Sequence, residues 1–158
     1  MKRPYAAVLA LVFCSAMVFA GGSRAQSNVA DVALADFGVR MSAPVGSRIV
    51  DSPAVSGLLI QGPNFAINVT RATQHDPRDA ASAASPAASG LLGSASDVNT
   101  EQLSDGFLVT LTTTTDQGSL YSLVGRRTIG NTSLMCRTTV MERAQRDAAA
   151  QACRSIRP

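Results

Sequence analysis

The sequence predicts an α+β fold, a mostly antiparallel sheet with a C-terminal helix packed on it in an α/β/α sandwich-like arrangement. Three observations support this prediction. Several short runs alternate apolar and polar residues, which is the period of a strand with one buried face. Turn-forming glycine, proline and asparagine separate neighbouring runs by a few residues, which favours hairpins. The last run instead places its apolar residues at helical spacing.

In the N-terminal half, residues 29–35 are predicted to form a short helical lead. The segment "FGVRMSAPVGSRIVDS" then reads as extended, because Val39, Met41 and Ala43 alternate with polar residues. Residues 48–51 are predicted to form a second short strand. The next segment, "GLLIQGPNFAINVTRAT", predicts a hairpin that turns at residues 61–64.

Residues 76–97, "DPRDAASAASPAASGLLGSASD", interrupt the strand pattern with alanine and serine. Asp76-Pro77 predicts the start of a short helix that ends at Ala84. Beyond it we expect a flexible loop, because small side chains bury too little area to offset the entropy of ordering. A functional lid is the alternative, but a tolerated insertion is favoured.

Strand signals resume at "GFLVTLTTTT", where Phe107, Val109 and Leu111 share one face. The threonine run, residues 112–115, is predicted to be a solvent-facing strand end that enters a turn at residues 116–118. Further along, Gly130-Asn131 predicts a tight hairpin turn between two β-prone runs.

Residues 132–138 are predicted to form the second arm of this hairpin, and the rest of the closing segment, "LMCRTTVMERAQRDAAAQACRSIRP", predicts one amphipathic helix. Thr139 and Glu142 have the spacing of a capping box, in which each side chain bonds the other residue's backbone amide. The face predicted to be buried holds Ala148, Ala149, Ala152, Cys153 and Ile156, and the face predicted to meet water holds Arg143, Asp147 and Arg154.

The start of the chain resembles a secretory signal over residues 1–25. Lys2 and Arg3 precede an apolar run, and small residues lead to a predicted cleavage after Ala25, with Ala20 as the alternative. A lipid anchor on Cys14 is disfavoured, because bulky Phe13 stands where a small residue is expected. Residues 26–158 then form a single exported domain, periplasmic or secreted.

Removal of this signal changes the charge of the chain. The full sequence has fourteen basic and eleven acidic residues, but Lys2, Arg3 and Arg24 leave with the signal. Eleven of each sign remain, so there is no electrostatic case for a nucleic-acid partner. No later apolar run is long enough to span a membrane, which takes about 20 residues.

Cys136 and Cys153 are the two cysteines of the predicted mature chain, and we expect them to form a structural disulfide. An oxidising compartment would couple them, and the strand and helix that carry them fold together. A redox pair normally has a C-x-x-C spacing, and a zinc site needs four ligands where His75 is the only histidine. The sequence therefore predicts no catalytic residue, metal site or cofactor.

Two further groups are candidates for function. Arg126, Arg127 and Arg137 are predicted to lie on neighbouring strands, where their guanidinium groups could bind an anion or a partner. The alternative is that these arginines are exposed strand residues whose charge keeps the sheet from associating with other chains. His75 with Asp76 or Asp79 could form an acid–base site, although a solvated turn is favoured.

The segment "FGVRMSAPVG", an early strand followed by Pro44 and Gly46, resembles the PsbP-like proteins, together with the later strands and the closing helix. This resemblance implies a small secreted α/β/α sandwich that serves for binding or assembly rather than catalysis. We therefore expect an exported binding module of the bacterial cell envelope, whose partner is an unknown protein or envelope component. A small secreted hydrolase, or a protease inhibitor that presents residues 76–97, is the alternative.

Overall fold

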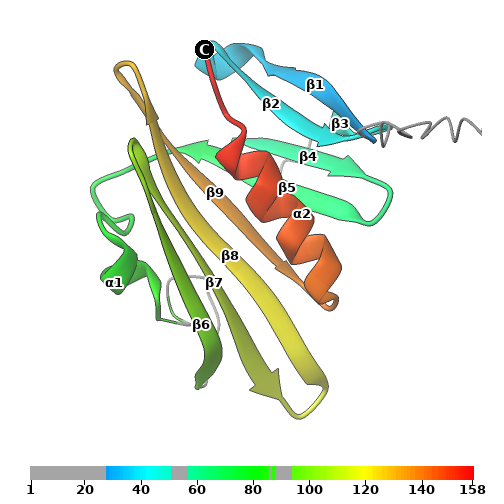
Figure 1. Ribbon diagram of the computed structural model, residues 1–158, viewed down its shortest axis with the longest axis vertical. Coiled ribbons are helices and arrows are strands. Elements are labelled where there is room, and N and C mark those ends of the chain that lie inside the picture. Colours follow the sequence, from blue (N-terminus) through cyan, green and yellow to red (C-terminus); the bar gives the residue numbers. More distant parts are fainter. Residues whose placement is uncertain (1–27, 51–56, 86, 88–93) are drawn as a thin grey trace, which may run out of the picture.

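The computed structural model describes residues 28–50, 57–85, 87 and 94–158, and the predicted signal peptide lies outside them. A seven-stranded antiparallel sheet forms the centre, and a long C-terminal helix, α2 (Arg143–Arg154), crosses one of its faces (Figure 1). The predicted α+β fold is confirmed. The strands, in their order across the sheet, are β3 (Arg48–Val50), β4 (Leu58–Gly62), β5 (Phe65–Arg71), β9 (Thr132–Val140), β8 (Gly118–Ile129), β7 (Gly106–Thr115) and β6 (Ala95–Leu103).

The three predicted hairpin turns are present. In the β4–β5 hairpin Gly62 pairs with Phe65, and in the β8–β9 hairpin Ile129 pairs with Thr132 around Gly130 and Asn131. Asn64 and Gly130 have positive φ angles of 49° and 57°, which asparagine and glycine tolerate best. The β7–β8 hairpin turns between residues 115 and 118, as expected.

A separate hairpin of β1 (Val29–Leu34) and β2 (Val39–Pro44) packs beside α2, with a short 3₁₀ turn, η1 (Ala35–Phe37), between its strands. The strand expected at Val39 is confirmed, whereas the helix expected over residues 29–35 is wrong. Pairing with β2 and burial of Leu34 outweigh the helix propensity of the alanines, since packing commonly overrides such weak preferences.

The sheet separates two hydrophobic clusters. The larger one lies under α2 and the β1–β2 hairpin, and includes Leu123, Leu134 and Ile156. The smaller one lies on the opposite face under α1 (Ala80–Ala83), where Ala83 meets Phe107 and Val124. The helix predicted up to Ala84 is therefore present, but it starts later than expected, at an Asp79 cap that accepts from the Ser82 amide at 2.8 Å.

Three local predictions are wrong. Residues 95–103 form edge strand β6, although the flexible loop was expected to run to residue 97 and no strand was expected after it. Thr112 and Thr113 are buried rather than solvent-facing. The capping box at the start of α2 is absent because Thr139 still belongs to β9, where its hydroxyl lies 3.0 Å from that of Ser122.

The helix packs as its sequence predicts. Ala149, Ala152, Cys153 and Ile156 are buried, while Arg143, Asp147 and Arg154 are exposed. Cys136 on β9 and Cys153 on α2 form the expected disulfide, with their Cα atoms 6.1 Å apart and both residues fully buried. This bond fastens α2 to the middle of the sheet.

Candidate functional site

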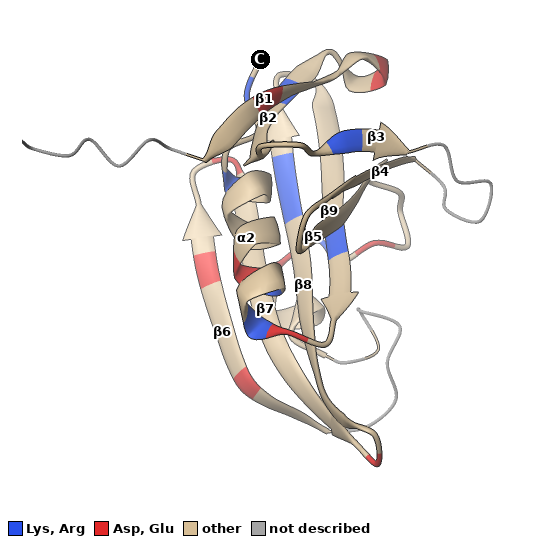
Figure 2. Ribbon diagram, turned by 90° about the vertical axis from the view of Figure 1, so that its right-hand side faces the viewer, with Lys and Arg blue, Asp and Glu red and all other residues tan. Residues whose placement is uncertain are grey.

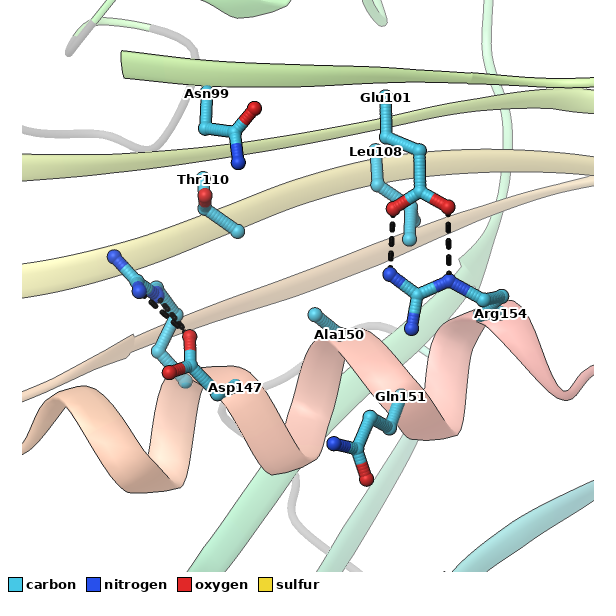
Figure 3. A pocket seen from close by; sticks show the side chains of 9 residues that line it. Asn99, Glu101, Leu108, Thr110, Asp147, Ala150, Gln151 and Arg154 are labelled. Atoms are coloured by element: carbon cyan, nitrogen blue, oxygen red, sulfur yellow. Dashed lines mark hydrogen bonds and ion pairs between the residues drawn. The ribbon is translucent and has the colours of Figure 1, made fainter. Parts of the chain in front are cut away.

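A polar groove of about 390 Å³ lies between α2 and the β6–β7 edge of the sheet (Figure 3). Leu108 and Ala150 supply its apolar surface, and the rest of its lining is polar. The polar residues are Asn99, Glu101, Thr110, Arg146, Asp147, Gln151 and Arg154. A volume near 400 Å³ is at the lower end of the range for small-molecule sites.

The local structure explains why these side chains converge. Asn99 and Glu101 stand opposite Thr110 and Leu108 in the β6–β7 pairing, so all four face the helix side of the sheet. On α2, residues 146, 147, 150, 151 and 154 recur at intervals of three and four and face the sheet edge. Figure 2 shows acidic positions on β6 alongside α2.

Two ion pairs link β6 to α2 across the groove. Near one end, Arg154 donates to both carboxylate oxygens of Glu101, at 3.0 and 2.5 Å. Beyond the other end, Arg143 reaches Asp97 at 3.1 Å. The hydrogen bond from Arg154 lowers the pKa of Glu101, so this pair stays ionised at neutral pH. Because both pairs are about half exposed, they contribute little stability.

Arg146 is the most buried charged residue of the groove, at 5 % exposure. Its Nε and Nη2 both donate to one oxygen of Asp147, at 2.9 and 2.6 Å. The guanidinium also lies 5.7 Å from the ring centroid of Tyr121, within the range of a cation–π contact. Among the described residues its third nitrogen, Nη1, has no hydrogen-bond partner, nor is it among the fully buried unpartnered atoms. The Nη1 group is thus not fully buried, and Arg146 is one of the residues that line the groove.

Asn99 and Thr110 face the same space with unused hydrogen-bonding capacity. They are a cross-strand pair of β6 and β7, and their side chains lie on the side of the sheet that faces α2 (Figure 3). Neither side chain makes a hydrogen bond to another part of the described chain. A ligand in the groove would therefore find an amide, a hydroxyl and one guanidinium edge available.

No protein-family model and no curated protein matches this chain. Among solved structures, the cyanobacterial PsbP protein (CyanoP) of Synechocystis sp. PCC 6803 is similar, with a TM-score of 0.53 and 11 % sequence identity. The match covers 85 % of this chain and 95 % of that one. The chain has a PsbP-like fold. This finding confirms the resemblance expected from the sequence, and at such low identity it concerns the fold alone.

Within this PsbP-like fold, the three arginines predicted as one cluster are divided between the two faces of the sheet. Arg127 faces α2 and is buried at 7 % exposure, whereas Arg126 and Arg137 face α1. Arg127 donates to both carboxylate oxygens of Asp105 and to the backbone carbonyls of residues 153, 154 and 156. These carbonyls belong to the C-terminal end of α2, where a cation is favourable.

The α1 face carries two shallow hollows, of about 600 and 500 Å³. Arg137 lines the first and pairs with Asp76 at 2.6 Å; Arg126 lines the second and donates to the Pro77 carbonyl at 3.1 Å. In each of these two arginines, one guanidinium nitrogen donates a hydrogen bond to an acceptor within the described residues. The remaining donors of both groups are available at this face.

The residues around His75 form a structured turn. His75 itself is exposed. Burial acts to raise the pKa of Asp76, but hydrogen bonds from Arg137 and Thr73 outweigh it and hold that pKa below its usual value. Asp79 has a lowered pKa because it caps α1 through Ser82. Both carboxylates are therefore engaged and weakly basic, so they are poorly suited to act as general bases beside His75.

The last two features of the described residues concern metal binding and membrane insertion. Within that part of the chain, no three His, Cys, Asp or Glu side chains come close enough together to hold a metal ion. None of its helices has the length and apolar character needed to cross a membrane.

Proposed function

We propose that this protein is an exported, non-catalytic binding or assembly module of the bacterial cell envelope, and that the groove between β6 and α2 contacts its partner. The observation that carries the proposal is that Asn99, Thr110 and Arg146 line one groove and have donors or acceptors without a hydrogen-bond partner among the described residues. Polar groups held together in a partly buried site favour an occupant that satisfies them.

Two other observations support the proposal. A buried disulfide suits an oxidising compartment, which agrees with the secretory signal predicted at residues 1–25. The PsbP-like fold agrees as well, since the family resemblance implies binding or assembly rather than catalysis. We retain Arg126 and Arg137 as a second candidate surface for an anion or a partner, because most of their donors have no hydrogen-bond partner among the described residues.

Site-specific photo-crosslinking in the producing cells tests the proposal. A photoreactive amino acid replaces Gln151 on the rim of the groove, and in a matched variant it replaces exposed Gln117 in the distant β7–β8 turn. We expect a discrete adduct with an envelope component from position 151 and none from position 117. The same adduct from both positions, or no adduct from position 151, would contradict the proposal.

A further inference from the structure

We propose that the groove recognises a carboxylate group of its ligand and that Arg146 receives it. This inference deepens the proposed function and rests on it. Two nitrogens of the Arg146 guanidinium donate hydrogen bonds to a single oxygen of Asp147, and the third nitrogen does not take part. A guanidinium presents donors along more than one edge, and the edge that carries Nη1 is left for a ligand.

Burial makes this open edge effective. The Arg146 side chain is 7 % exposed, whereas that of Asp147 is 51 % exposed. The cation therefore lies in a medium of low polarity, while Asp147, its one carboxylate partner among the described residues, is about half solvated, so its charge is incompletely offset. The two hydrogen bonds to Asp147 and the nearby Tyr121 ring restrain the guanidinium, which reduces the entropy that binding would cost.

The neighbouring groups fit the same ligand. Asn99 and Thr110 line the same groove as Arg146, and both offer donors, an amide N–H and a hydroxyl. A carboxylate has two oxygens with room for about four hydrogen bonds, so one group can use the guanidinium and both neighbours.

The charge balance of the groove favours a carboxylate over a phosphate. Three arginines, at positions 143, 146 and 154, face three carboxylates, at positions 97, 101 and 147. The groove therefore has no surplus of positive charge to hold a dianion close to Glu101 and Asp147. A single negative charge placed at Arg146 suffers less repulsion from those two residues.

Titration of ¹⁵N-labelled protein with small probes tests this inference. Acetate is compared with acetamide, which has the same shape without the charge, and with inorganic phosphate. We expect acetate to shift the Arg146 Nε–H and Asn99 side-chain signals saturably, acetamide to leave them unchanged, and phosphate to bind at least tenfold more weakly. Equal shifts with acetamide, or tighter binding of phosphate, would overturn the inference.

Two variants locate the binding. Arg146→Lys keeps the charge but loses the planar fork, and we expect it to weaken acetate binding at least tenfold. Arg48→Lys, on exposed β3 at the opposite edge of the sheet, is the matched control and should bind acetate as the wild type does. Unchanged acetate affinity in Arg146→Lys would contradict the assignment. The acetamide comparison uses wild-type protein, so it decides the question even if Arg146→Lys does not fold.

Two peptide probes identify the source of the carboxylate. Trialanine with a free C-terminus carries it on the main chain, and N-acetyl-Ala-Glu-Ala-amide carries it on a side chain. Binding of either supports the inference and names the source, while binding of neither contradicts it. If carboxylates fail to bind but crosslinking at position 151 still captures a partner, the proposed function stands and this inference is wrong.

Discussion

Arg127 and Asp105 form a two-point ion pair, with Nε and Nη2 of the arginine 2.9 and 2.7 Å from the two carboxylate oxygens. The same guanidinium donates to the carbonyls of Cys153 and Ile156, at 2.7 and 3.1 Å. One side chain of β8 therefore joins the β6–β7 turn to the C-terminal end of α2. This position gives Arg127 a structural role that the neighbouring Arg126 does not share.

Arg127→Met should destabilise the protein by about 3 kcal/mol, because it strands Asp105 and several helix carbonyls without a donor. Arg126→Met is the matched control, and its single bond to the Pro77 carbonyl predicts a loss of about 1 kcal/mol or less. Urea unfolding of both variants measures the difference. Equal destabilisation would contradict the role given to Arg127.

Acid should unfold the protein partly through Asp105. The hydrogen bond from Arg127 lowers the pKa of Asp105 in the folded state. Its stabilising effect is therefore complete above the unfolded-state pKa of about 3.9 and is lost as the pH falls through the lower folded value. We expect the urea concentration at the unfolding midpoint to decrease as the pH is lowered below about 4. In Asp105→Asn this decrease with pH should be less steep. An equal slope in that variant would exclude Asp105 as a contributor.

The disulfide should contribute about 3 kcal/mol, the value expected for a loop of this length. Replacement of Cys136 and Cys153 by alanine should lower the free energy of unfolding by at least that amount, since two buried sulfur atoms are also lost. Reductant should lower the melting temperature of the wild type and leave the double variant unchanged. A wild type insensitive to reductant under unfolding conditions would contradict this.

Gly125→Ala should cost about 1 to 3 kcal/mol through overpacking against the disulfide. A Cβ atom at this position would lie 2.7 Å from a terminal carbon of Leu108 and 3.0 Å from the Cys153 sulfur. The leucine can rotate away, but the crosslinked sulfur cannot. The same substitution should cost less when both cysteines are alanine, and a double-mutant cycle measures that coupling. Independent, additive effects would show that the disulfide is not the obstacle.

Strands β2 and β5 were predictable because each buries every second residue and so has one apolar face. Val39, Met41 and Ala43 alternate as expected, and the helix face that carries Cys153 follows from its spacing. Strand β6 was not predictable in this way. It is an edge strand with polar residues toward both sides, because one side meets the groove and the other meets solvent. Without β6 the groove, and with it the importance of Asn99 and Arg146, could not be found.

The prediction that Arg126, Arg127 and Arg137 form one binding patch could have been improved from strand geometry alone. Arg126 and Arg127 are consecutive in β8, and successive side chains of a strand point to opposite faces. The two residues could not share one binding surface. The prediction of a capping box at Thr139 was wrong for a different reason. Pairing with β8 extends β9 through Thr139, and this pairing cannot be read from the local sequence.

The β1–β2 hairpin is bound by Arg157, a residue more than 100 positions later in the sequence. Arg157 pairs with the backbone of Arg40 at 2.8 and 3.0 Å, and its guanidinium contacts Asp31 at 2.6 and 2.7 Å. A nascent chain emerging from the ribosome cannot form these contacts until residue 157 has been made. The hairpin can therefore make these contacts only after α2 and the residues that follow it have been synthesised.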